Sequence, residues 1–175
     1  MDFLELAKKR YSVRRFKTDK IEKEKLDLIL EAGRVAPTAG NFQPQRILVI
    51  ESEESLAKLK TCTPAHFNAP LALLICFDSR ASWKNTRGEE AGDVDASIVT
   101  THMMLEAAGL GIGSTWVGVF DFNKTREVFD IPDYIIPVAL LPLGYPAPAS
   151  KPDIRHKQRF DLNHTVFYNS FESIV

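Results

Sequence analysis

Hydrophobic and polar positions follow a helical period in two long stretches of the chain. In EKEKLDLILEAGR (residues 22–34) the core-type positions recur at i, i+3, i+4 and i+7, at Leu26, Ile29, Leu30 and Gly33. This spacing predicts a helix with one face on a core. Residues 89–110 form a longer, mostly uncharged stretch, in which positions near the same period are Val94, Ile98, Thr101, Leu105 and Ala108. We expect this second helix to be central.

Four other stretches are typical of β-strands, namely RILVIE (46–51), LALLICFD (71–78), STWVGVF (114–120) and IPVALLPLG (136–144). Pro142 lacks a backbone donor, which favours an edge or a bulge at that point. Shorter helices are expected at residues 2–10, 55–60 and 123–129, and residues 10–16 should be extended. Strands interleaved with helices predict a layered α/β or α+β domain with helices on both faces of the sheet.

Length and charge narrow the classes of protein. A chain of 175 residues with 45% hydrophobic and 26% charged residues is typical of one globular unit. The 22 Lys and Arg residues almost cancel the 23 Asp and Glu residues, so we expect neither nucleic acid nor an anionic membrane as a partner. The chain has no apolar run of roughly 18 residues and no secretory leader at its start, which favours the cytoplasm.

Several catalytic chemistries find no support in the sequence. The two cysteines do not form a CxxC motif, and Cys76 lies in an apolar run, which favours a core residue over a nucleophile. The four histidines lack the spacing of metal ligands. GLGIG (residues 109–113) follows a helix and precedes a strand, the reverse of a dinucleotide-binding turn, so it is interpreted as a helix end.

The segment RYSVRRF (residues 10–16) concentrates positive charge in a chain that is otherwise balanced. In an extended backbone Arg10, Ser12 and Arg14 project to one side, while Tyr11, Val13 and Arg15 project to the other. Two guanidinium groups and a hydroxyl on one side suit a phosphate monoester. A solvated basic edge is the alternative. Lys157 and Arg159 near the C-terminus could add charge to the same phosphate, or could simply be solvated.

Two loops are further candidates for binding. APTAGNFQPQ (residues 36–45) combines prolines and small residues with the amides of Asn41, Gln43 and Gln45, and could face a planar polar ligand. An ordinary helix-to-strand connection is the alternative. SRASWKNTRGEEAG (residues 79–92) could form a lid in which Trp83 and Arg87 contact a substrate, or a plain surface loop.

Four motifs in the same order resemble those of the FMN-dependent nitroreductase family. The first is R-x-S-x-R-x-F at Arg10 to Phe16, and the second is A-P-T-x-x-N-x-Q-P at Ala36 to Pro44. The third, G-L-G followed by W-V-G, spans Gly109 to Gly118. The fourth is G-Y-P at Gly144 to Pro146, together with K-x-R in the tail. The resemblance covers essentially the whole chain.

The resemblance implies an α+β, three-layer fold with a central, mostly antiparallel sheet, built as an intertwined homodimer with two FMN sites at the subunit interface. Residues 1–146 would form the FMN-binding domain, and residues 147–175 a tail that packs on the partner through Val166, Phe167, Tyr168 and Phe171. The residues implied near the phosphate are Arg10, Tyr11, Ser12, Arg14, Lys157 and Arg159. Those implied around the ring and ribityl chain are Pro37, Thr38, Ala39, Asn41 and Gln43 from the partner, and Thr115, Trp116, Val117 and Gly118.

The activity that the resemblance implies is transfer of hydride from NADH or NADPH, through FMN, to an electron-poor acceptor such as a nitroaromatic or a quinone, in ping-pong order. No side-chain nucleophile is required, because the cofactor carries the chemistry. Two alternatives stay open. One keeps the fold with another flavin reaction, such as dehalogenation, heterocycle oxidation or flavin breakdown. The other is a flavin-binding protein without turnover.

Overall fold

The computed structural model of the chain describes residues 2–171, and it has the predicted three layers around one antiparallel sheet. The strand order is β1-β2-β4-β3. The strands are β1 (Gln45–Ile50), β2 (Leu71–Asp78), β3 (Gly113–Ser114) and β4 (Ile135–Gly144). Among the described residues, no helix has both the length and the hydropathy needed to cross a membrane. The predicted α+β fold class is confirmed.

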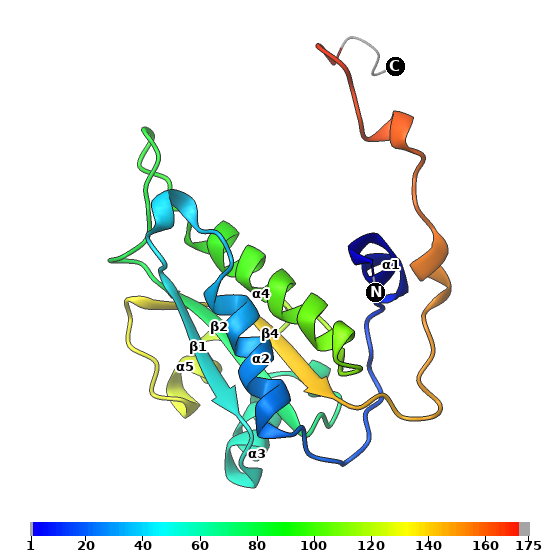
Figure 1. The fold of residues 1–175 in the computed structure, drawn as a ribbon. Helices are drawn as coiled ribbons and strands as arrows, with labels where there is room; N and C mark the ends of the chain where they lie inside the picture. Colours follow the sequence, from blue (N-terminus) through cyan, green and yellow to red (C-terminus); the bar gives the residue numbers. More distant parts are fainter. Residues whose placement is uncertain (1, 172–175) are drawn as a thin grey trace.

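Helices cover both faces of this sheet (Figure 1). They are α1 (Phe3–Lys9), α2 (Lys23–Arg34), α3 (Glu53–Cys62), α4 (Gly92–Gly109) and α5 (Phe122–Val128). The short 3-10 turns are η1 (Ala39–Asn41), η2 (Pro64–His66), η3 (Ile154–Lys157) and η4 (Leu162–His164). Helices α2 and α4 pack on one face, whereas α3 and α5 lie on the other.

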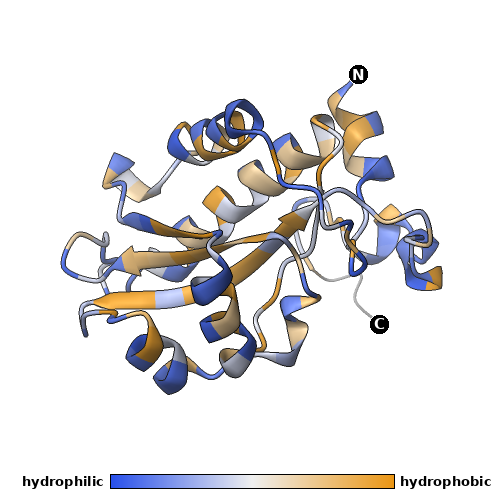
Figure 2. Ribbon diagram, turned by 90° about the horizontal axis from the view of Figure 1, so that it is seen from below, coloured by the Kyte–Doolittle hydropathy of each residue, from blue (hydrophilic) through white to orange (hydrophobic). Residues whose placement is uncertain are grey.

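Strand β2 is buried along its whole length because both of its faces carry helices. Leu71, Leu73 and Ile75 face the cluster formed with α2 and α4, and the residues between them face the opposite cluster. Figure 2 shows the strands, coloured mostly as hydrophobic, between the helical layers. Cys76 is only 3% exposed within the second cluster, so its interpretation as a core residue is confirmed.

The strand predicted at residues 114–120 is much shorter in the structure. β3 pairs with β4 only at Gly113 and Ser114, and one isolated bridge joins Val117 to Leu140.

The prediction that Pro142 marks an edge is wrong, because β4 lies between β2 and β3. Leu140 exchanges both backbone hydrogen bonds with Val117, so its N–H points to the β3 side of β4. The nitrogen of Pro142, two residues later, points to the same side, where β3 has already ended. The register shift in β4 lies instead opposite Ile75 and Cys76.

The ends of α4 differ slightly from the prediction. The helix begins at Gly92 rather than near residue 89, because the preceding residues form a hairpin closed by a bridge between Lys84 and Glu90. At the other end Gly111 has a φ of 76°, a left-handed conformation that terminates the helix. The interpretation of GLGIG as a helix end is therefore confirmed.

Candidate functional site

Three of the four sequence motifs meet at the C-terminal end of α4. The segment of residues 10–16 runs beside β3, where Ser12 and Ser114 form a bridge and the Val13 N–H donates to the Ser114 carbonyl at 2.9 Å. Its far end is bridged by Phe16 and Pro146. Segments that are distant in the sequence thus share one end of the sheet, as the lower right of the sheet in Figure 1 shows.

Val13 fixes which way the neighbouring side chains point. It is 2% exposed and packs directly on Gly113, where an added Cβ would lie 2.7 Å from Val13 Cγ2. Only glycine allows this approach without a shift of the neighbouring chain. Because an extended backbone alternates its sides, burial of Val13 turns Ser12 and Arg14 outward together, as the sequence predicts.

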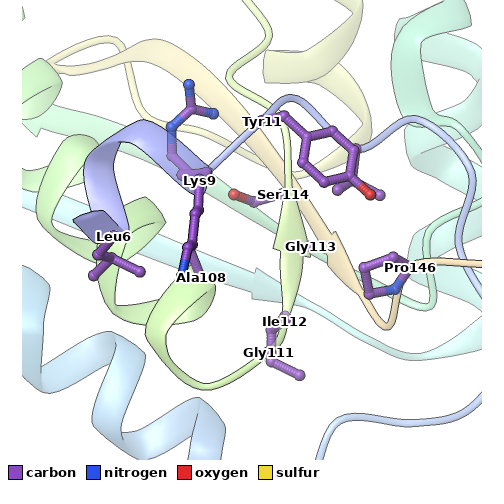
Figure 3. Close-up of a pocket in the computed structure, with 11 residues that line it drawn as sticks. Leu6, Lys9, Tyr11, Ala108, Gly111, Ile112, Gly113, Ser114 and Pro146 are labelled. Atoms are coloured by element: carbon purple, nitrogen blue, oxygen red, sulfur yellow. The ribbon is translucent and has the colours of Figure 1, made fainter. Parts of the chain in front are cut away.

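Two neighbouring cavities flank this segment. Figure 3 shows the first, which is mostly apolar, holds about 160 Å³ and lies between α1, the end of α4 and β3. The second holds about 280 Å³ and is polar. Its lining residues are Arg10, Tyr11, Ser12, Arg14, Asp153, Arg155, His156 and Arg159. Cationic residues from both ends of the chain therefore converge on one cavity.

The second cavity, which we call the cationic cavity, has a positive net charge, since four arginines line it with one aspartate. Burial, and then the neighbouring Arg159 guanidinium, lower the pKa of Arg10 below its ordinary value. Within residues 2–171 neither Arg10, Arg14 nor Arg159 forms an ion pair. A bound anion would relieve this repulsion, so the donors present fit a phosphate group.

The tail contributes Arg159 as predicted, but its second residue differs from the prediction. Arg155 lines the cationic cavity, whereas Lys157 is not among the described residues that do so. The turn η3 explains the difference. In an extended tail, residues two apart, such as Lys157 and Arg159, would face the same side. The turn instead brings together residues four apart, and Arg159 donates to the Arg155 carbonyl at 3.1 Å. No motif in the sequence pointed to Arg155.

Among residues 2–171, Asp153 is the carboxylate that lines the cationic cavity. Its Oδ1 accepts a hydrogen bond from Arg155 Nε at 2.7 Å. The side-chain bond from Arg155 is the main reason why the pKa of Asp153 falls to about 2. Arg155 is thus already paired with a carboxylate, whereas Arg159 donates to the backbone carbonyls of Arg155 and Gln158.

Trp116 and Gly118 follow directly from β3. Trp116 is 42% exposed, whereas Thr115 and Val117 are buried. The indole lies over Gly118, where an added Cβ would come within 2.8 Å of Trp116 Cζ3. The tryptophan and the backbone beside it therefore present a surface that begins one residue beyond Thr115, close along the chain to Ser114, where residues 10–16 meet β3.

The loop of residues 37–43 lies at the opposite end of α4. The Ala39 N–H donates to Asp95 Oδ1 at 2.8 Å, in the first turn of that helix, while Ala108 near its other end lines the apolar cavity, which shares Arg10 and Tyr11 with the cationic cavity. Asp95 and Ala108 stand thirteen positions apart on α4, which is about 20 Å at about 1.5 Å per residue. The structure of one chain thus does not bring Pro37, Thr38, Ala39, Asn41 and Gln43 to the cationic cavity.

The candidate lid lies beside this loop. Trp83 Cδ1 is 3.6 Å from the position of a Cβ built on Gly40, and the Trp83 carbonyl accepts the Ala91 N–H at 2.9 Å. Arg87 instead pairs with Glu89 within the hairpin at 2.8 Å. The indole of Trp83 therefore borders the loop, whereas the Arg87 guanidinium is engaged locally.

Comparison with known proteins gives consistent matches. A profile of the Nitroreductase family matches residues 7–62 and 61–145. A protein of Methanothermobacter thermautotrophicus, named as an NADH dehydrogenase/NAD(P)H nitroreductase, is 34% identical over 84% of this chain and 78% of its own. The crystal structure of a nitroreductase family protein from Clostridium difficile 630 is 44% identical, with a TM-score of 0.92 over 97% of this chain and 99% of that one. An FMN-dependent nitroreductase from Clostridium difficile R20291 is 28% identical, with a TM-score of 0.80 over 96% and 99% of the two chains.

Proposed function

The chain belongs to the nitroreductase family, and on that premise we propose that it is an FMN-dependent oxidoreductase that uses NADH or NADPH. The observation that carries the proposal is the cationic cavity, in which Arg10, Ser12, Arg14 and Arg159 converge from both ends of the chain. A relative of similar fold is named as FMN-dependent, and FMN carries the phosphate monoester that such a cavity suits.

The phosphate would be held mainly by arginine side chains. Arg10 and Arg14 supply planar donors that can each bind two phosphate oxygens, and Ser12 lines the same cavity. Arg159 would add a third guanidinium group from the tail. Lys157, which the family motif implies, could join them only if its side chain turned toward the cavity, since Arg155 takes that place in the single chain.

A second copy of the chain would complete each site. The loop of residues 37–43 lies about 20 Å along α4 from the cationic cavity, so it would reach a flavin there only from the partner. The outer face of α4 supplies a surface for such pairing, because Val94 is 60% exposed and lines an open groove with Ile98 and Thr101. We infer a homodimer in which α4 helices lie near each other.

The tail would extend this interface. Residues 147–171 run away from the body of the domain, beside α1 (Figure 1). Phe160, Leu162, Tyr168 and Phe171 are each more than two-thirds exposed in the single chain. Such a density of exposed apolar groups favours burial on a partner. Residues 1–146 would then act as the flavin domain and residues 147–175 as the tail, of which residues 172–175 lie outside the described part.

The bound flavin would supply the redox chemistry, taking hydride from NADH or NADPH and passing it in ping-pong order to an acceptor such as a nitroaromatic or a quinone. The chain's own residues would bind and orient. The backbone N–H groups of Trp116 and Gly118 would face the ring, since that of Val117 donates to the Leu140 carbonyl. The Trp116 indole would shield one side of the ring from water. Cys76 has no part in this scheme as a nucleophile, because burial raises its pKa to about 12.

The test is the visible spectrum of the purified protein, followed by identification of the released flavin and by steady-state oxidation of NADH and NADPH with a quinone or a nitrofuran. The proposal predicts a yellow protein that releases FMN and turns over with at least one of these acceptors. A colourless protein that binds no added FMN would contradict it. FMN without turnover would favour the flavin-binding alternative.

A further inference from the structure

Asp95 is a buried carboxylate that the proposed phosphate site does not use. It lies in the first turn of α4 and is 1% exposed. Its Oδ1 accepts the Ala39 N–H at 2.8 Å, whereas Oδ2 has no hydrogen-bond partner among the described residues. Burying an acid with half of its acceptor capacity unused lowers stability. A residue of this kind is expected where its contact serves the function rather than the stability of the fold.

The loop that Asp95 contacts has an uncommon backbone. Gly40, Asn41 and Gln43 have φ angles of 56°, 59° and 51°, so two residues other than glycine adopt the left-handed conformation within three positions. Such conformations persist where the surroundings fix them, and they concentrate at functional sites. The loop therefore needs an external support.

Hydrogen bonds inside the loop close it on itself but do not place it. The Asn41 N–H donates to the Thr38 carbonyl at 2.9 Å, and the Gln43 N–H donates to Thr38 Oγ1 at 3.1 Å. For residues 37–42, the contact with Asp95 is the hydrogen bond that joins the loop to another element of the described chain. Asp95 thus fixes where the whole turn stands relative to α4.

We propose that Asp95 is a positioning residue for the cofactor: through the Ala39 N–H it holds the loop of residues 37–43 in the shape that borders the flavin ring of the partner subunit. The proposal rests on the proposed function, because it takes the loop to line that ring. It assigns the contact to ligand binding rather than to folding alone. Because α4 also offers the proposed dimer surface on its outer face, its buried side would set the loop while its outer side pairs with the partner.

Two substitutions separate the loss of the hydrogen bond from the loss of the carboxyl group. Asp95→Asn keeps an oxygen that can accept the Ala39 N–H, and it removes the charge from a buried position. Asp95→Ala leaves that N–H without its acceptor. We expect Asp95→Ala to weaken FMN binding by about tenfold or more, and Asp95→Asn to restore most of the affinity. The visible circular dichroism of bound flavin should change in the alanine variant and not in the asparagine variant.

Thr100→Ala is the matched control. Thr100 is fully buried on the same helix, and its hydroxyl donates only to the Ala96 carbonyl at 2.7 Å, away from the loop. Its loss should lower the stability of α4 without an effect on FMN affinity. If Thr100→Ala and Asp95→Ala weaken FMN binding equally, the effect is one of general stability and the inference is overturned.

Amide hydrogen exchange at Ala39 in the flavin-free protein gives a readout that does not depend on the cofactor. Exchange should be slow in the wild type and in Asp95→Asn, and at least about tenfold faster in Asp95→Ala. Unchanged exchange in Asp95→Ala overturns the inference, and so does faster exchange with unchanged FMN affinity. A wild type that binds no FMN but protects Ala39 contradicts the proposed function instead, and it limits Asp95 to holding the loop.

Discussion

The backbone N–H of Val13 donates to the carbonyl oxygen of Ser114 at 2.9 Å, which joins the N-terminal segment to the strand that follows the longest helix. This contact orders the arginines on either side of Val13. It also occupies the Ser114 carbonyl, next to the point where β3 ends. The geometry of the cationic cavity therefore depends on a backbone contact that carries no charge.

Gly113→Ala should damage this contact. The new Cβ would lie 2.7 Å from Val13 Cγ2, so residues 10–16 would have to move. Overpacking of this kind costs roughly 1–3 kcal/mol of unfolding free energy, which urea denaturation would measure. Because Ser12 and Arg14 move with Val13, FMN affinity should fall as well.

Gly109→Ala is the control for that substitution. A Cβ at Gly109 would meet only Leu6 Cδ2, at 3.8 Å, and the residue stands at the last position of α4. Alanine there should be neutral or should stabilise by up to about 1 kcal/mol. If both glycine variants lose the same stability, close packing of Val13 on Gly113 does not order the segment.

The double substitution Arg10→Ala with Arg14→Ala should leave the domain folded and remove FMN. Each arginine would contribute charge-assisted hydrogen bonds to the phosphate, so the two together should weaken FMN binding by at least about 100-fold. Riboflavin lacks the phosphate, and its weaker binding should change little. Equilibrium dialysis of both flavins would measure the difference.

A matched variant removes the same charge elsewhere. Lys23 and Arg34 form exposed pairs with Asp27 and Glu31 on α2, and neither lines the cationic cavity. Lys23→Ala with Arg34→Ala should retain FMN. Stoichiometric FMN in the variant that lacks Arg10 and Arg14 would show that the phosphate lies elsewhere.

Truncation after Pro146 should weaken dimerisation. It removes the exposed apolar residues of the tail, among them Phe160 and Phe171, and so removes area that a partner would bury. Sedimentation velocity over a range of concentrations would measure the shift toward monomer. An unchanged dimer would mean that α4 and the body of the domain form the interface without the tail.

The pair of Asp78 and Arg80 predicts a dependence of stability on pH. Arg80 Nη2 donates to Asp78 Oδ2 at 2.8 Å, and the side-chain bonds from Arg80 are the main reason why the pKa of Asp78 falls to about 2. Because the folded pKa lies below the unfolded one, near 3.9, the stabilisation is complete above about pH 5 and is lost as the pH falls through about 2.

Arg80→Ala should therefore destabilise the protein at neutral pH, with a difference from the wild type that shrinks between about pH 5 and pH 2. Urea denaturation at three pH values would measure it, and an NMR titration of the Asp78 carboxyl should show its pKa returning toward the ordinary value. A difference that stays constant down to pH 2 would assign the loss to the contact between Arg80 and the Tyr134 ring, 3.4 Å from the ring centroid.

Much of the fold could be predicted from periodicity, since α2, α4 and the buried strand β2 all follow directly from their hydrophobic spacing. Tertiary pairing could not. The sequence around Thr115 has strand composition, yet its pairing with β4 breaks between Ser114 and Val117. The neighbouring segments determine where this break falls, and the local sequence does not. Arg155 was missed because a local turn, not an extended chain, places the tail. Asp95 has no signal in the sequence, since its importance arises from burial beside a loop that lies 56 residues away.

Mixed dimers test the central claim most directly, because the phosphate and the ring would be held by different subunits. One subunit would carry Arg10→Ala with Arg14→Ala, and the other Ala39→Trp, whose indole would fill the ring side. Each variant alone should bind no FMN. A mixed dimer purified through two different tags should regain half of the wild-type flavin content, since one of its two sites then contains neither defect. Mixed dimers without flavin would show that each site is built within one chain, which contradicts the account.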